Sequence, residues 1–244
     1  MGSVLPPVAD KPRYVADMFE RIAARYDLMN TLMTFGQDAR WRSVVADMLL
    51  DGPHPDRPLI LDVGTGTGRL AQTVRQTLPG ARVVGVDFSQ GMLRRAPRHL
   101  ALAAGDALRL PFADAQFDAV ISGFVVRNLG DVNAGVAEQV RVLRPGGLLV
   151  ILETTPGPRG AIRFAYRLYF RRAVPWLGTL IAGDALAYTY LPESTLAFLE
   201  PARLAHLMRE RGLRDVRTSR LSLGSVAVTR GRKPAMLAVA GGDS

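Results

Sequence analysis

The stretch Leu59-Ile-Leu-Asp-Val63, continued by Gly64-Thr-Gly-Thr-Gly68 and a helical pattern at 69–78, identifies the architecture of this chain. An apolar run of strand length that ends in glycines and opens into a helix is typical of the first unit of a doubly wound α/β sheet. The pattern continues with apolar runs at 82–86, 100–104, 117–121 and 148–152, and with helical patterns at 89–98 and 131–143. This alternation predicts five parallel strands that are buried on both faces.

The flanking segments add helices and two further strands to this core. Residues 13–33 carry apolar side chains at helical spacing, which predicts one amphipathic helix, and a second helix is expected at 39–50. The C-terminal third predicts a basic helix at 159–173, an irregular apolar stretch to Pro192, a helix at 200–211 and strands at 216–221 and 225–229. We therefore expect one α/β domain with a seven-stranded, mostly parallel sheet.

Composition excludes several classes of protein. The 244 residues are 48% hydrophobic and 22% charged, which excludes a disordered or low-complexity chain, and the lack of cysteine excludes thiolate metal sites and cysteine nucleophiles. No apolar stretch approaches the ~20 residues that span a bilayer, and the N-terminus has no signal-peptide core, so we expect a cytoplasmic protein. The net charge of +9, carried by 29 arginines and 2 lysines, favours an anionic partner or reflects genome composition.

The glycine bend and three strand-end carboxylates predict a nucleoside-binding edge. The run Gly64-Thr-Gly66-Thr-Gly68 lets backbone N–H groups approach a ligand, but it lacks the GxGxxG spacing of dinucleotide enzymes, which argues against a dehydrogenase. Asp62 precedes the bend, Asp87 ends the second strand where it can accept hydrogen bonds from ribose hydroxyls, and Asp106 follows the third strand where it can accept one from an adenine amino group. This arrangement resembles the class I methyltransferases, which have a Rossmann-like fold and use S-adenosylmethionine.

Longer motifs resemble one family within that class, the quinone C-methyltransferases, which methylate demethylmenaquinol and polyprenyl-methoxybenzoquinol. In the N-terminal half the motifs are Met18-Phe19-x-x-Ile22-Ala23-x-x-Tyr26-Asp27-x-x-Asn30, Gly36-x-x-x-x-Trp41-Arg42 and Val86-Asp87-Phe88-Ser89-x-x-Met92-Leu93. In the C-terminal half they are Phe124-Val-Val-Arg127-Asn128, Arg141-Val-Leu-x-Pro145-Gly146-Gly147, Ala187-Tyr-x-Tyr190-Leu191-Pro192-x-Ser194 and the ending Gly224 to Gly231. The resemblance runs from about residue 13 to residue 234.

This resemblance implies a function, a cofactor and a domain layout. It implies C-methylation of a prenylated quinol in respiratory quinone biosynthesis, demethylmenaquinol to menaquinol above all, with a benzoquinol acceptor as the alternative. The expected S-adenosylmethionine site consists of Asp62, Gly64, Thr65, Gly66, Thr67, Gly68, Asp87, Phe88, Met92, Asp106, Ala107 and Ser122. The expected layout is a flexible N-terminus at 1–12, one domain at 13–235 and a tail at 236–244. Within the domain we expect a helical lid at 13–50, a cofactor-binding core at 57–155 and a segment facing the substrate or a membrane at 156–200.

The chemistry of quinol methylation directs attention to the end of the fourth strand. The reaction needs a ring carbon made nucleophilic by removal of a phenolic proton, and a fixed guanidinium favours the phenolate without losing a proton itself. We expect Arg127 in this role, Asn128 as the group that orients the ring oxygen, and Tyr26 and Asp27 of the lid as weaker candidates. The histidines, His54, His99 and His206, show no ligand spacing, so no metal is expected.

Three departures from the family pattern are Arg69 in place of an acid after the glycine bend, Val125-Val126 before Arg127, and Thr154-Thr155 after Glu153. Arg69 puts in doubt the contact that the acid would make with the donor or with the first helix turn.

Partners are expected on the basic C-terminal third. Arg159, Arg163, Arg167 and Arg171 recur at helical spacing, and Ile162, Ala165, Leu168 and Tyr169 fall roughly opposite. This pattern predicts either peripheral contact with anionic lipid or a cap helix with a solvated basic face and an apolar stripe packed on the protein. An RNA methyltransferase is the weaker alternative, because no recognisable RNA-binding module is appended, and a homodimer stays open.

Overall fold

The computed structural model describes residues 6–7, 10–51, 54–158, 160, 162–179 and 184–235. Seven strands form one sheet in the order β3-β2-β1-β4-β5-β7-β6. Their bounds are Leu59–Val63 (β1), Arg82–Asp87 (β2), Ala101–Ala104 (β3), Phe117–Gly123 (β4), Leu143–Thr154 (β5), Arg214–Leu221 (β6) and Val226–Arg232 (β7). The first five in this order are parallel, and β7 is antiparallel to both β5 and β6. The predicted seven-stranded, mostly parallel sheet is confirmed.

Helices cover both faces of this sheet. On one face, α3 (Gln37–Met48) and α4 (Arg69–Thr77) pack on β1, β4 and β5. On the other face lie α6 (Val132–Val142) and α10 (Pro201–Glu210). The strand order reverses between β1 and β4, and in open α/β sheets such a switch point leaves a crevice at the carboxyl ends of the strands.

The N-terminal segment differs from the single helix predicted for 13–33. It forms α1 (Lys11–Ile22) and α2 (Tyr26–Met33), separated by a turn at 23–25. One unbroken helix of that length would be about 30 Å long, so its two ends could not contribute to one compact cluster. The turn instead brings Val15 and Met18 of α1 together with Met29 of α2 in a shared core.

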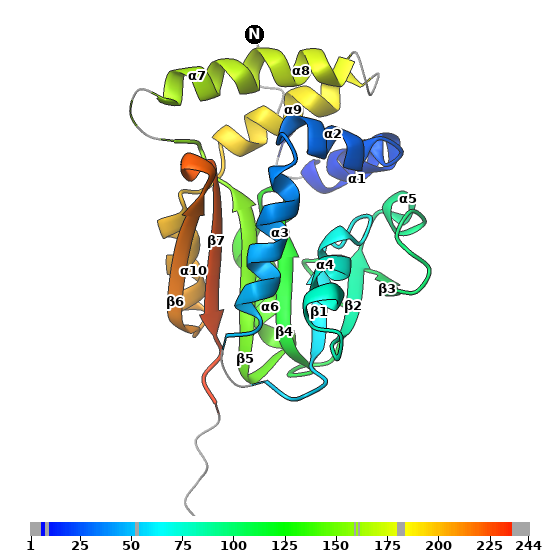
Figure 1. The fold of residues 1–244 in the computed structure, drawn as a ribbon, viewed down its shortest axis with the longest axis vertical. Helices are drawn as coiled ribbons and strands as arrows, with labels where there is room; N and C mark the ends of the chain where they lie inside the picture. Colours follow the sequence, from blue (N-terminus) through cyan, green and yellow to red (C-terminus); the bar gives the residue numbers. More distant parts are fainter. Residues whose placement is uncertain are drawn as a thin grey trace, which may run out of the picture.

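The predicted lid at 13–50 is also shorter than expected. The helix predicted at 39–50 is α3, whose Trp41, Val45 and Ala46 are buried against the sheet, so it belongs to the helix layer on that face. Only α1 and α2 lie above the carboxyl edge of the parallel strands, beside α7–α9 (Figure 1). Of the predicted flexible N-terminus, Lys11 and Pro12 are helical, while residues 1–5, 8–9 and 236–244 lie outside the described residues.

Between β5 and α10 the structure is more helical than the sequence indicated. The basic helix predicted at 159–173 is formed by α7 (Ile162–Leu168) and the π-helix η2 (Tyr169–Ala173). The helices α8 (Val174–Leu177) and α9 (Ala185–Leu196) follow, where an irregular stretch was predicted up to Pro192. Helix α9 is apolar on more than one face and buries Ala187, Tyr188 and Tyr190 against α1 and α2, so it carries no amphipathic period to detect. None of the described helices is both long and apolar enough to cross a membrane.

The remaining differences are smaller. The helix predicted at 89–98 is only α5 (Gln90–Leu93), capped by the hydroxyl of Ser89. The short 3₁₀ helices η1 (Val126–Asn128) and η4 (Ser222–Gly224) follow β4 and β6.

Candidate active site

The glycine bend after β1 is open toward the crevice. Gly64, Gly66 and Gly68 have φ values of 65°, 56° and 79°, in the left-handed region that favours glycine. A Cβ atom added to Gly66 would meet nothing within 4 Å, whereas one on Gly68 would lie 2.6 Å from Leu100. Gly66 therefore provides close access to a ligand, and Gly68 provides close packing on the strand side.

Asp62 is a buried carboxylate with one oxygen unused. Its Oδ2 accepts a hydrogen bond from the Thr65 hydroxyl at 2.7 Å, while Oδ1 has no partner within the described chain. Burial raises the pKa of Asp62 to about 7. A buried, unpartnered acceptor beside the glycine bend fits the ammonium group of the S-adenosylmethionine expected from the sequence.

A smaller cavity of about 180 Å³ lies at the ends of β2 and β3. Both oxygens of Asp87 are held by backbone N–H groups, Oδ2 by Gly66 at 2.9 Å and Oδ1 by Ser89 at 2.8 Å, so the carboxylate has a fixed orientation. Burial raises the pKa of Asp87. The expected cofactor residues that line this cavity are Gly64, Gly66, Asp87, Phe88, Met92, Asp106 and Ala107. A carboxylate at one end and the exposed ring of Phe88 fit the ribose and adenine of an adenosyl group.

A larger cavity of about 350 Å³ adjoins the first. The two cavities share the lining residues Tyr26, Gly64, Gly66, Gly123 and Phe124, so their boundary lies at the switch point between β1 and β4. Asp62, Thr65 and Thr67 line the larger cavity. Ser122 and Gly68, which the sequence placed in the cofactor site, line neither; Ser122 is fully buried within β4.

Arg127 is buried behind the larger cavity and carries an ion pair that the sequence did not predict. Its Nη1 lies 2.5 Å from Oε1 of Glu153, and its backbone N–H donates to Oε2 of the same carboxylate at 3.1 Å. Burial alone would lower the pKa of Arg127, but the attraction of Glu153, its hydrogen bond and the nearby Tyr26 together raise the pKa. Arg127 lines the cavity, and its Nε, although buried, has no hydrogen-bond partner within the described chain. The guanidinium is therefore fixed and retains a free donor.

Tyr26 and Asn128 occupy different positions relative to Arg127. Tyr26 is at the boundary of the two cavities, and burial raises its pKa. Asn128 lines the smaller cavity; its amide donates to the carbonyl of Phe124 at 3.2 Å, and its Oδ1 accepts from Tyr190 at 3.4 Å. Arg127 and Asn128, which are neighbours in sequence, thus line the larger and the smaller cavity respectively.

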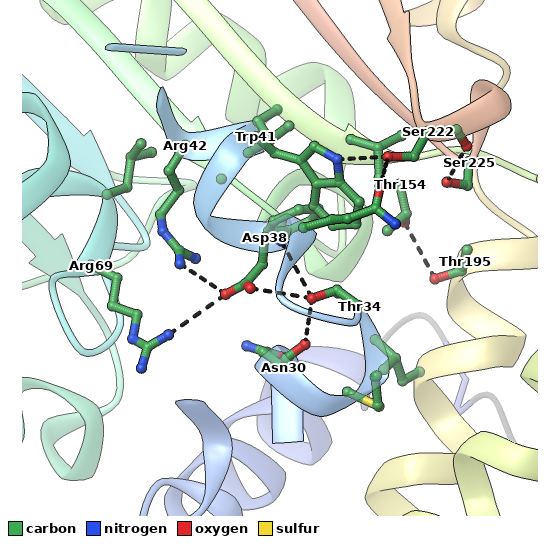
Figure 2. A pocket seen from close by; sticks show the side chains of 18 of the residues that line it. Asn30, Thr34, Asp38, Trp41, Arg42, Arg69, Thr154, Thr195, Ser222 and Ser225 are labelled. Atoms are coloured by element: carbon green, nitrogen blue, oxygen red, sulfur yellow. Dashed lines mark hydrogen bonds and ion pairs between the residues drawn. The ribbon is translucent and has the colours of Figure 1, made fainter. Parts of the chain in front are cut away.

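Arg69, the residue that departs from the family pattern, connects the glycine bend to the N-terminal helices. Its Nε lies 3.2 Å from Asp27 and its Nη1 donates to Thr31 at 3.3 Å. Asp38 of α3 is 3.6 Å from Arg69 and 2.8 Å from Arg42, so the buried carboxylate lies between two guanidinium groups (Figure 2). Asp27 also accepts a hydrogen bond from Thr67 at 2.8 Å. Asp27 therefore serves as a contact between α2 and the bend.

Two further contacts that the sequence did not reveal hold α1 over the smaller cavity. Lys11 donates to the carbonyls of Arg127 and Leu129 at 2.8 and 2.9 Å. Glu20 accepts from the Ser89 hydroxyl at 2.9 Å and from the Gly91 N–H at 2.8 Å, and these bonds lower its pKa. Both pairs join residues distant in sequence, so no local pattern could indicate them. Among the described residues, no group of three histidines or acids could hold a metal ion.

Comparisons with known proteins agree with this geometry. A family model described as the ubiE/COQ5 methyltransferase family matches residues 8–233. The demethylmenaquinone methyltransferase of Thermus thermophilus is 46% identical, over 89% of this chain and all of the relative, and the ubiquinone/menaquinone biosynthesis C-methyltransferase UbiE of Desulfotalea psychrophila is 42% identical over 93% of each. A SAM-dependent methyltransferase structure from Thermotoga maritima, 19% identical, has a TM-score of 0.65 over 89% of this chain and 99% of that chain, which shows a shared fold. The chain belongs to the ubiE/COQ5 methyltransferase family.

Proposed function

We propose that this S-adenosylmethionine-dependent methyltransferase methylates a ring carbon of a prenylated naphthoquinol, converting demethylmenaquinol to menaquinol. The observation that carries the proposal is the meeting of two unlike cavities at Tyr26, Gly64 and Phe124, one with strand-end carboxylates and one with a buried guanidinium and apolar walls. The Thermus relative, 46% identical over its whole length, is named for this activity.

The smaller cavity would hold the adenosyl part of the donor, and the methionine part would extend past the shared boundary to Asp62, which lines the larger cavity. Asp87 would accept hydrogen bonds from the ribose hydroxyls, Asp106 and Phe88 would contact the adenine, and Asp62 would pair with the ammonium of the methionine part. S-Adenosylmethionine supplies an electrophilic methyl group on a sulfonium. With the adenosyl part at β2 and β3 and the amino acid part at β1, that methyl group would be near the shared boundary of the cavities.

The larger cavity would hold the acceptor ring. A ring oxygen against the free Nε of Arg127 would be stabilised as phenolate, which raises electron density at the adjacent ring carbon. The sulfonium would give its methyl group to that carbon and depart as a neutral thioether, and the ring carbon would then lose its proton to solvent, which restores the aromatic ring. Glu153 would keep Arg127 in place throughout, because its carboxylate binds both the side chain and the backbone of Arg127.

A peripheral membrane contact through α7 and α8 forms part of this proposal. Phe164 and Trp176 are 76% and 65% exposed, and Ile162 and Leu168 are half exposed, so these side chains are not packed on the protein as the cap-helix alternative required. Tyr169 and Val174 of the same segment do pack against α1 and α2. Arg163 and Arg171 are exposed, while Arg167 is partly buried and Arg159 lies outside the described residues. The π-helical turn η2 changes the helical phase after Leu168, which interrupts the single arginine stripe expected from the sequence.

A labelling assay tests the proposed reaction. The purified chain is given methyl-labelled S-adenosylmethionine with either reduced demethylmenaquinone or a reduced polyprenyl-methoxybenzoquinone, both dispersed in detergent. We expect label in the naphthoquinol product. Label only in the benzoquinol would move the proposed function to ubiquinone biosynthesis, and label in neither would refute it.

A further inference from the structure

Two large apolar side chains stand exposed at the rim of the larger cavity. Phe35, in the turn between α2 and α3, is 77% exposed, and Leu223, in η4, is 76% exposed, yet both line the cavity. Their φ values are 52° and 57°, in the left-handed region that bulky side chains rarely adopt. Neither burial nor backbone preference favours these residue types here, and a strained, exposed apolar pair beside a cavity indicates a binding role.

Hydrogen bonds hold the two turns together, although they are distant in sequence. The Ser222 hydroxyl donates to Oε1 of Gln37 at 2.5 Å and accepts from Nε1 of Trp41 at 2.9 Å. Figure 2 shows the bond between Trp41 and Ser222 at this wall of the pocket. On the other side, the ring of Tyr169 lies 5.8 Å from that of Phe35, and its hydroxyl donates to the carbonyl of Met33 at 2.9 Å. The rim is therefore a defined structure built from three segments.

The lining of the larger cavity is largely apolar. Met33, Phe170, Val174 and Leu191 line it, and all are partly or fully buried. A cavity of about 350 Å³ is too small to enclose a bicyclic ring together with a long hydrocarbon tail, so the tail must leave it. In the proposed arrangement the ring oxygen lies at Arg127 and the donor lies beyond Gly66. The tail would therefore leave the cavity at the apolar rim that contains Phe35 and Leu223.

We propose that Phe35 and Leu223 form the exit of the acceptor site and hold the first isoprene units of the substrate's tail. This proposal rests on the proposed function, because the ligand class is a linear polyisoprenoid attached to the reacting ring. Each side chain gains burial when the tail binds, so the pair contributes to affinity for tailed acceptors and makes no contact with a tail-less one.

Other exposed apolar residues provide a matched control. Phe164 and Trp176 are exposed to a similar extent, but neither lines the cavity. If the rim acted only by attaching the protein to lipid, both pairs would have the same effect on catalysis. If the rim contacts the tail, only the Phe35 and Leu223 pair will discriminate between acceptors in detergent micelles, where no bilayer is present.

The experiment compares Phe35→Asn/Leu223→Asn with Phe164→Asn/Trp176→Asn. Asparagine tolerates positive φ, so the rim variant removes apolar contact while relieving backbone strain. For each protein, kcat/KM is measured with a tail-less naphthoquinol and with one carrying several isoprene units, and donor affinity is measured by calorimetry. We expect the rim variant to lose about tenfold in kcat/KM for the tailed acceptor alone, with donor affinity unchanged, and the control to match the parent.

The outcomes separate the exit from the reaction itself. The proposed exit is wrong if the rim variant keeps the parent's preference for the tailed acceptor. It is also wrong if kcat/KM falls equally for both acceptors. In either case the proposed reaction stands. The proposed exit is wrong as well if the control variant loses the preference for the tailed acceptor to the same extent as the rim variant. If the unchanged chain methylates neither naphthoquinol, the proposed function fails and the exit fails with it.

Discussion

The buried surroundings of Arg127 limit the substitutions that can test its role. Its charge is paired with Glu153, and both side chains are almost fully buried. Removing one member of a buried ion pair leaves the other uncompensated and costs about 3–5 kcal/mol. Replacement by alanine would therefore combine a folding defect with a catalytic one.

A substitution that keeps the charge avoids this problem. Arg127→Lys retains a cation opposite Glu153 but removes Nε, the buried donor that has no partner within the described chain. We predict that kcat falls by about a hundredfold while donor affinity, measured by calorimetry, changes less than about twofold. Arg144→Lys, at the opposite end of β5, is the matched control. An unchanged kcat in Arg127→Lys would remove the guanidinium from the mechanism.

The raised pKa of Asp62 predicts that donor binding depends on pH. Its pKa of about 7 lies above the ordinary value of 3.8 because of burial, and a bound ammonium favours the charged form, so binding releases a proton below pH 7. We predict that donor Kd rises up to about tenfold for each pH unit below 7 and is constant above it. Calorimetry from pH 5.5 to 8.5 measures this, and Asp62→Asn should bind weakly at every pH.

The same shift has a consequence for stability. Between pH 4 and 7 the folded chain holds a proton on Asp62 that the unfolded chain has lost, so this group lowers folding stability as pH rises through that interval. Asp62→Asn should therefore keep or raise the melting temperature at pH 8. A marked fall would show that the carboxylate supports the fold.

Helix α1 is attached to the sheet edge at both ends. Lys11 binds carbonyls beside η1, and Glu20 binds the Ser89 hydroxyl and the N–H of Gly91 at α5. Between these contacts, Val15 and Phe19 line the smaller cavity. The position of this helix should therefore control donor affinity.

Releasing both ends tests this arrangement. In Lys11→Met/Glu20→Met we predict that donor Kd rises about tenfold, because neither new side chain can replace the lost hydrogen bonds and α1 shifts away from the donor site, with little change in melting temperature. Glu210→Gln, which removes an exposed pair with His206 on α10, is the control. Donor affinity equal to that of the parent would show that α1 has no part in closing the cavity.

The helices that cover the proposed site lie at one end of the molecule. Helices α1, α2 and α7–α9 gather above the carboxyl edge of the parallel strands, as Figure 1 shows. The exposed side chains Phe164 and Trp176 and the exposed Arg163 and Arg171 lie in the segments that cover this edge. A tailed quinol leaving the cavity at Phe35 and Leu223 would meet the same end of the molecule.

Vesicle co-sedimentation tests the membrane contact. Arginines near an anionic surface contribute about 1 kcal/mol each. We therefore predict that Arg163→Gln/Arg171→Gln weakens binding to phosphatidylglycerol-rich vesicles about thirtyfold at physiological salt, and that Phe164→Asn/Trp176→Asn weakens it further. Arg217→Gln, an exposed arginine on β6, should bind like the parent. Absence of binding by the parent would exclude a peripheral role of this segment.

Local patterns were sufficient for the sheet and for placing the residues of the proposed donor site at one edge of it. Each strand of the core is a short apolar run, and its ends are marked by Gly, Pro or Asp, because burial on both faces demands apolar residues and a tight bend demands glycine. Asp62, Asp87 and Asp106 could be placed together because parallel strands end at one edge. The family motifs extended this to the acceptor side through Arg127.

Long-range packing determined the rest. The break at 23–25 exists because α1 and α2 must meet α9, and α3 covers the sheet because Trp41 and Val45 find a core there. Partners such as Glu153 for Arg127 and Glu20 for Ser89 are separated by 26 and 69 positions. Periodicity reports only which face of an element is apolar. Which surface receives that face, and which charge meets which, depends on packing the whole chain into one volume.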